Sequence, residues 1–370
     1  MIAALLFAHA VWLSPQVDTL WKKVMLAMPP KSSTLLTFWS PVDPIDPPKK
    51  SPKKFGVNKI QWEFPWMVEG YSQSPDFGFH KFFRVFAQEQ KGDRISQVTQ
   101  MLLRLWDLNY KNLRLSHSPK YNGGLVEVYL CFGGKAGGEQ LFEVDKGLDI
   151  RTHRDTDVTV NTIYIYDMTS FTDPIEMARE VAHEYGHATL PPVGGFQEPE
   201  DWADGYLGEK LFLRWIRDGM AKGLLVPQDA MGATKADLDK WIATNVDPLI
   251  DAAAIVAPTQ TAMSDKSASG MNEFIGLALY VETLFGDTVF ARSMKMNSVS
   301  PADYPASAVL AIEEPETVKF NIPQSLIGKL IWIPLGTGKL KGAVWIKRDP
   351  SGWVQIMGKA GEITISNTPP

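Results

Sequence analysis

The residues best suited to chemistry stand together in the run His183-Glu184-Tyr185-Gly186-His187. Side chains four positions apart lie on the same face of a helix, so the imidazoles of His183 and His187 would reach one tetrahedral zinc ion. Glu184 would point beside the ion, where it would take a proton from a metal-activated water. The spacing therefore predicts a Zn²⁺ site with two histidine ligands and Glu184 as the catalytic base.

The surrounding sequence predicts the helix that this geometry requires. The run Asp173-Pro174-Ile175-Glu176 combines an N-cap residue, a proline at the first helical position and an acidic first turn. Pro191-Pro192 stops the helix, so we expect it to span 173–190, between a strand at 158–166 and a second helix at 200–217. The alternative is a pair of structural histidines, and the capped helix favours the metal site.

Residues 158–217 resemble the gluzincin branch of the zincin metallopeptidases, which have a peptidase MA-like domain. The shared order is an edge strand, a His-Glu-x-x-His helix, a loop, and a second helix with an acidic third ligand. The resemblance covers roughly residues 80–295 in element order, and its specific residues are confined to 183–209. The metzincin pattern is absent, because residues 188–192 supply neither its glycine nor its third histidine. The resemblance implies an α+β fold with a zincin-like domain, and Zn²⁺-dependent hydrolysis of peptide bonds in a peptide or protein substrate.

The resemblance also implies an acidic third ligand, for which the sequence offers several residues. Gluzincins often carry Trp-x-x-Glu-Gly on the second helix, and this chain has Trp202-Ala203-Asp204-Gly205, one residue shorter and with Asp in place of Glu. Asp204 and Glu209 both fall opposite the expected polar face of this helix. From the Asp-Gly match we predict Asp204 as the ligand, with Glu209 as the second choice. They lie about 140° apart on the helix, so one ion would not bind both. Alternatively, Asp204 caps the helix or pairs with Arg214. The expected polar face consists of Ala203, Lys210, Arg214 and Arg217, and the remaining acidic candidates are Glu198, Glu200 and Asp201.

The chain departs from the gluzincin pattern at the residue that stabilises the oxyanion, which is usually a Tyr or a His. Near Phe274, where the resemblance implies a tyrosine, the sequence has none, so Tyr280 or His153 would have to substitute. A packed aromatic and a solvated histidine are the simpler interpretations of these two residues. The departure favours an alternative function, a zincin-fold metal-binding envelope or binding protein without turnover, whereas Glu184 favours the peptidase.

Composition restricts the class of protein. A net charge of −5 argues against a nucleic-acid partner. The single cysteine, Cys131, excludes an internal disulfide. We expect Cys131 to be buried in a strand at 125–132. The apolar run 1–13 contains Ala8-His9-Ala10 and resembles a secretory signal cleaved after Ala10. We therefore expect a secreted or cell-envelope location, with a buried N-terminal segment as the alternative. No later stretch is expected to span a membrane.

The sequence divides into four parts. Residues 1–10 are the possible signal peptide, and 11–54 form an N-terminal segment that ends in a Pro/Lys-rich connector at 41–54. The predicted zincin-like domain spans 55–298, and a small β-domain that would position substrate or anchor the enzyme spans 299–370. Further helices are predicted at 93–105, 234–255 and 272–295, a flexible glycine-rich turn at 133–138, and short strands at 330–333, 342–347 and 353–357 around a turn at 349–352.

Overall fold

The computed structural model describes residues 35–41, 66–74, 78–88, 94–149, 154–259 and 262–367. The predicted signal segment 1–10, all of the connector except Pro41, and His153 lie outside these ranges. The described chain is an α+β protein, as predicted, and it forms two compact units. The first consists of the described residues within 1–108, 116–189 and 215–235, and the second of those within 109–115, 190–214 and 236–370. Each unit is described here by itself.

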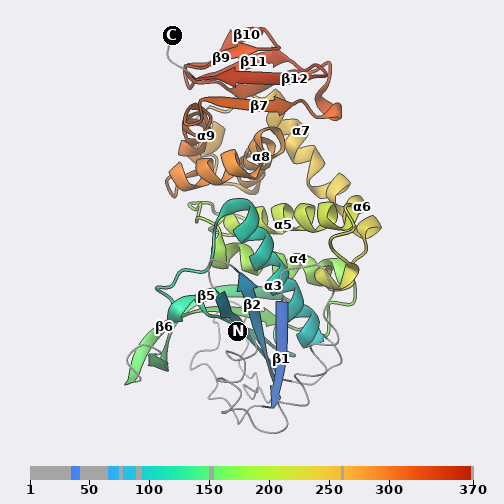
Figure 1. Cartoon of the computed structure of the whole chain (residues 1–370), viewed down its shortest axis with the longest axis vertical. Coiled ribbons are helices and arrows are strands. Elements are labelled where there is room, and N and C mark those ends of the chain that lie inside the picture. Colours follow the sequence, from blue (N-terminus) through green and yellow to red (C-terminus); the bar gives the residue numbers. More distant parts are fainter. Residues whose placement is uncertain are drawn as a thin grey trace. The chain divides into compact units, whose positions relative to one another are not determined.

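A six-stranded mixed sheet forms the core of the first unit (Figure 1). Its strands lie in the order β1-β2-β3-β4-β6-β5. The central strands β3, β4 and β6 are parallel, whereas the β1–β2, β2–β3 and β5–β6 pairs are antiparallel, so β5 is an antiparallel edge strand. The strands are β1 (Leu35–Pro41), β2 (Trp66–Ser74), β3 (Gly78–Ala87), β4 (Val126–Leu130), β5 (Gly137–Asp149) and β6 (Arg154–Tyr166).

Among these strands, only β4 and β6 were predicted from the sequence. The sheet begins with β1, which precedes the connector, although we had expected only an N-terminal segment there. β5 starts at Gly137, inside the run 133–138 that we interpreted as a flexible turn. Glycines and charged residues in β5 hide its strand character, because alternation of apolar and polar residues is the signal that identifies strands.

Two helices cover one face of the sheet (Figure 1). Helix α3 (Arg94–Leu113) lies over β2, where Gly70 brings the backbone close to the side chains of Thr99 and Leu103. Helix α4 (Pro174–Thr189) packs over β5 and β6, and the Asn161 amide donates a hydrogen bond to the Ala188 carbonyl (3.1 Å). The predicted helices at 93–105 and 173–190 are thereby confirmed, and α4 is the element that carries His183, Glu184 and His187.

The remaining helices correct the predicted boundaries. The predicted helix 200–217 begins four residues later than expected, and the predicted helix 234–255 is two helices that separate at Val246. Pro248 explains the break, because proline lacks the backbone N–H that would continue the preceding helix. The helices are α5 (Asp204–Ala221), α6 (Lys235–Asn245), α7 (Asp247–Ile255), α8 (Ala268–Met296) and α9 (Tyr304–Glu313).

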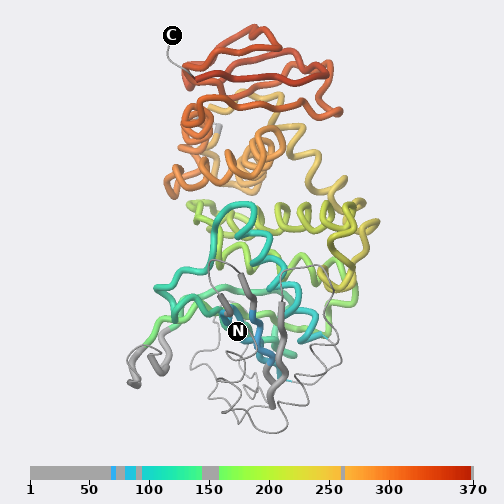
Figure 2. The backbone as a smooth tube through the Cα atoms, in the orientation of Figure 1, coloured from blue at the N-terminus to red at the C-terminus, as the bar shows by residue number. Residues whose placement is uncertain are grey.

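The second unit combines helices with two three-stranded sheets, ordered β10-β11-β8 and β7-β12-β9 (Figure 2, orange to red). Helix α9 was not predicted, and it packs against α8 through a hydrogen bond between the Tyr304 and Ser293 hydroxyls (2.9 Å). The Trp353 indole donates to the Pro305 carbonyl (3.0 Å), which ties β11 to the same helix. The strands are β7 (Thr317–Asn321), β8 (Leu330–Pro334), β9 (Lys339–Lys341), β10 (Trp345–Arg348), β11 (Trp353–Met357) and β12 (Glu362–Ser366).

Helix α8 is long and apolar enough to cross a membrane, so the prediction that no later stretch meets this description is wrong on length and composition. About 72% of its most apolar window is buried within the structure. Burial on this scale is typical of the core helix of a folded domain.

The buried side chain of His117 holds α4 in position through a hydrogen bond to Tyr185. The Nδ1 atom of His117 lies 2.8 Å from the Gly124 carbonyl oxygen, which only accepts, so Nδ1 carries the proton and donates. The Nε2 atom then accepts from the Tyr185 hydroxyl (3.1 Å), and Tyr185 is the residue between Glu184 and Gly186 in the motif. Both side chains are buried, and burial lowers the pKa of His117 to about 4.

We expect the metal-free protein to lose stability through His117 as the pH falls from about 6.5 to about 4. Because the pKa of His117 is lower in the folded protein, the unfolded chain takes up a proton on this histidine at higher pH. The free energy of unfolding therefore decreases as the pH falls over that interval. The decrease of this pKa from 6.5 to about 4 corresponds to about 3 kcal/mol in the free energy of unfolding, and all of this stabilisation is lost below pH 4. Urea unfolding between pH 7 and pH 4 with a chelator present measures it. His117→Gln should be less stable at pH 7 and show a shallower pH dependence, and an unchanged slope would contradict the assignment.

Candidate metal centre

The start of α4 is fixed by the residues that predicted it. The Asp173 carboxylate accepts a hydrogen bond from the backbone N–H of Ile175 (3.0 Å), which satisfies one of the donors left open at a helix N-terminus. The helix then divides the motif between two environments. His183 and His187 are half-buried on one face, while Glu184 and Tyr185 are buried.

The two histidines present their Nε2 atoms to each other at 3.2 Å, with the rings nearly perpendicular. Two nitrogen ligands of one tetrahedral zinc, each at about 2.0–2.1 Å from the ion, would stand about 3.3 Å apart. The observed separation therefore fits a shared Zn²⁺ ion without rearrangement of either imidazole.

The third group beside the histidines is Glu200. One carboxylate oxygen of Glu200 and one nitrogen of each histidine all lie within 4.8 Å of one another. Two imidazoles and one carboxylate form a ligand set that catalytic zinc sites use, with a fourth position left for water or substrate. Asp204, the predicted ligand, does not belong to this group.

Glu200 is held by a loop, not by a helix. Backbone hydrogen bonds close the loop at both ends, from Ala203 to the Val193 carbonyl (2.8 Å) and from Gly195 to the Asp201 carbonyl (3.0 Å). The Trp202 ring lies against Gly194, where a Cβ atom would approach the ring to 2.5 Å. The adjacent Gly195 has a φ of +91°, a conformation that favours glycine. The glycine pair therefore permits the turn that precedes Glu200.

The two acidic residues preferred from the sequence have other positions in α5. Asp204 is buried in the first turn, where a carboxylate interacts favourably with the helix dipole. The Glu209 carboxylate lies 4.0 Å from the Lys210 ammonium, and both side chains are buried. The expected polar face is therefore wrong, since Lys210 and Ala203 are buried and Arg214 bonds Glu282.

The catalytic-base candidate packs against the edge strand. A Cβ atom added at Gly138 on β5 would lie 2.5–2.6 Å from the Glu184 side chain, so the absence of a side chain there makes room for the carboxylate. The role of Gly138 was not predicted because its glycine-rich surroundings indicate a flexible turn. The signal that would have identified it is a glycine at the start of a strand next to the motif helix.

Of the two predicted substitutes for the oxyanion-stabilising residue, Tyr280 and His153, the structure describes Tyr280 alone. The Tyr280 side chain is fully buried, and its hydroxyl donates to the Trp332 carbonyl (2.9 Å). His153 lies outside the described residues. Cys131 is buried as predicted, and burial raises the pKa of its thiol, which makes it a poor nucleophile.

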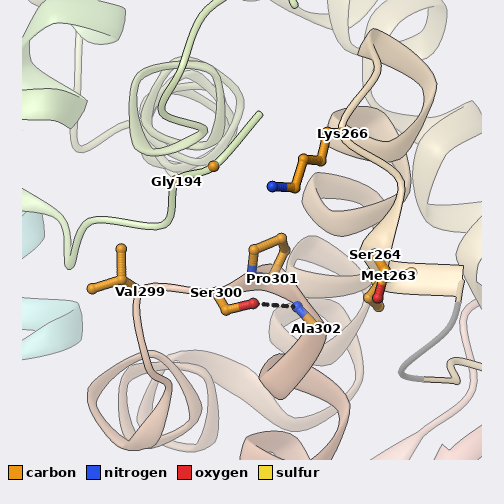
Figure 3. A pocket seen from close by; sticks show the side chains of 9 residues that line it. Gly194, Met263, Ser264, Lys266, Val299, Ser300, Pro301 and Ala302 are labelled. Carbon is orange, nitrogen blue, oxygen red and sulfur yellow. Dashed lines mark hydrogen bonds between the residues drawn. The ribbon is translucent and has the colours of Figure 1, made fainter. Parts of the chain in front are cut away.

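The loop that carries Glu200 also lines a cavity of about 360 Å³ within the second unit (Figure 3). Gly194 and Gly195 form one wall, and the Lys266 side chain extends into the cavity toward Gly194 and Pro301. The remaining lining is Met263, Ser264, Val299, Ser300 and Ala302.

Comparison with known proteins adds no assignment: no protein-family model matches the chain, and no curated protein is significantly similar to it.

We expect Gly138→Ala to reduce hydrolysis of a peptide substrate by roughly 10- to 100-fold while zinc binding is retained. The new methyl group would displace the Glu184 carboxylate, and a misplacement of about 1 Å is enough to cost about 100-fold in rate. The displaced group is the end of a flexible side chain, so the protein should fold. Lys135→Ala, on the exposed loop just before β5, is the control. Loss of zinc in the Gly138 variant would show that the glycine supports the ligands instead of the base.

Proposed function

We propose that the chain is a zinc-dependent metallopeptidase of the gluzincin type, with a zincin-like domain. The observation that carries the proposal is the pair of Nε2 atoms of His183 and His187, 3.2 Å apart on one helix, with a carboxylate beside them and the buried Glu184 between them in the sequence. A chance pair of structural histidines would not require the acidic neighbours that this site has.

We further propose His183, His187 and Glu200 as the zinc ligands, with Glu200 replacing our sequence-based choice of Asp204. Glu200 follows His187 by thirteen positions and precedes α5. The closed loop 193–203 supports this assignment, since its backbone hydrogen bonds hold the glutamate without help from a helix.

A zinc ion bound here would act as a Lewis acid that polarises the scissile carbonyl and acidifies a water molecule. The chain's own part in the reaction falls to Glu184. Its carboxylate accepts a proton from the attacking water and then donates that proton to the leaving amine. The packing of its side chain against Gly138 limits the conformations from which it does so.

The substrate would be a peptide or protein in a secreted or cell-envelope setting. A ligand side chain that entered the cavity lined by Gly194 and Gly195 would meet the positive charge of Lys266, which favours an acidic group (Figure 3).

A second candidate function is a zincin-fold metal-binding envelope protein without turnover. The observation that favours it is the burial of Tyr280, whose hydroxyl is committed to a backbone carbonyl and would not reach an oxyanion. Such a protein would bind zinc with the same three ligands and hydrolyse no peptide.

We expect Glu184→Gln to lower peptide hydrolysis by at least roughly 100-fold with zinc still bound at one equivalent, because general-base catalysis contributes about 10²–10⁴-fold. The matched control is Glu176→Gln, at the exposed first turn of the same helix. A peptide library with metal analysis provides both readouts. If the wild-type protein binds zinc but hydrolyses no member of the library, the binding protein is the correct function.

We expect Glu200→Gln to weaken zinc binding more than Asp204→Asn does. Loss of a ligand should exceed the roughly 10- to 100-fold typical of groups that only orient ligands. Competition with a chromophoric chelator measures both affinities, and Glu198→Gln, in the same loop and exposed, is the control. If Asp204→Asn releases zinc while Glu200→Gln retains it, Asp204 is the third ligand.

A further inference from the structure

Five exposed apolar side chains form a row along β10 and the adjoining ends of β11 and β8. Met357 pairs with Leu330, and Trp345 pairs with Ile356, so Val344 lies opposite Met357. Alternation along the strands places Val344, Met357 and Leu330 on one face of the sheet and Trp345 on the other. Figure 1 shows β10 on the side of the β-domain away from α8 and α9. The exposed fractions are 82% for Val344, 57% for Ile346, 48% for Trp345, 46% for Met357 and 41% for Leu330.

The part of the chain that carries this row is basic. Residues 317–348 contain six basic and no acidic residues, although the whole chain has a net charge of −5. Lys319 pairs with Glu362, Lys329 pairs with Asp251, and Arg348 donates to the Gly336 carbonyl. The other three, Lys339, Lys341 and Lys347, are exposed and contact no carboxylate in the described part of the chain. We call these three lysines and the five apolar residues the β10 patch.

The geometry of β10 disfavours a peptide partner that would add a strand. The register between β10 and β11 shifts between Trp345 and Lys347, which places a bulge at Ile346. Bulges and lysines on an edge strand prevent pairing with a further strand. The aliphatic side chains likewise disfavour nucleic acid, which is bound through stacked aromatic groups and phosphate contacts. An apolar row with a tryptophan and flanking lysines matches the boundary of an anionic lipid bilayer.

We propose that the β10 patch docks the protein on a membrane surface that contains anionic lipids. Val344 and Ile346 enter the boundary between headgroups and acyl chains, Trp345 lies at headgroup depth, and the three lysines contact lipid phosphates. This binding is peripheral and does not depend on the proposed peptidase activity.

Sedimentation of the full-length protein with vesicles tests the proposal. Vesicles of phosphatidylcholine with 30 mol % phosphatidylglycerol, at about 50 mM salt, should bind the protein, and pure phosphatidylcholine vesicles should bind it far less. Replacing Lys339, Lys341 and Lys347 together by Gln should weaken binding roughly 100-fold, about fivefold per lysine. Val344→Ser with Ile346→Ser should weaken it roughly tenfold.

Matched controls remove equal charge and equal apolar surface elsewhere. Lys135, Lys222 and Lys240 replaced by Gln, and Leu224→Ser with Val226→Ser, should bind as the wild type does, since all five residues are exposed outside the patch. Circular dichroism verifies folding of each variant. The proposal is overturned if the vesicles do not bind the protein or if the patch variants bind normally. Patch-dependent binding to single-stranded DNA, to an acidic peptide or to a second copy of the chain, without vesicle binding, overturns it as well.

Discussion

The rotation of helix α4 on the sheet determines where the motif side chains of the candidate site point. Because successive residues of a helix differ by about 100°, α4 turns two imidazoles outward, one carboxylate toward β5 and one tyrosine into the core within five positions. Only one rotation of the helix satisfies all four. The His117–Tyr185 hydrogen bond and the Asn161–Ala188 bond hold that rotation, and both partners come from the sheet or the loop beside it.

Local signals in the sequence predicted this helix. The position of Glu200 and the burial of α5 depend on contacts between distant residues, and they were not predicted. The capping residues, the proline stop and the four-residue histidine spacing all lie between Asp173 and Pro192, and the structure has α4 where they place it. Glu200 depends on a loop closed between residues 193 and 203 and on a ring lying against a glycine, which no periodicity reveals. Asp204 was preferred because Asp204-Gly205 matches the end of the gluzincin Trp-x-x-Glu-Gly run. The polar face assigned to α5 supported that choice, and the burial of Lys210 shows how tertiary packing overrides such an assignment.

In the C-terminal region whole elements were missed. The strands with apolar runs, β8 and β11, were predicted, whereas β7 and β12 were overlooked although each alternates polar and apolar residues, which is the local signal of a strand. Helix α9 escaped notice because its ten residues are mostly apolar and lack a polar face, so the 3.6-residue period is weak. Its place between α8 and β11 follows from hydrogen bonds to Ser293 and Trp353, which lie far apart in the sequence.

The contacts that orient α4 involve no metal, and this has a consequence for the behaviour of the protein in its surroundings. Metal sites that organise a fold lose the fold with the ion, but here the cap, the buried histidine and the Asn161 bond already fix the helix. The proposed ion would therefore not be needed to hold α4 in place, and its loss would leave the helix oriented by the same three contacts.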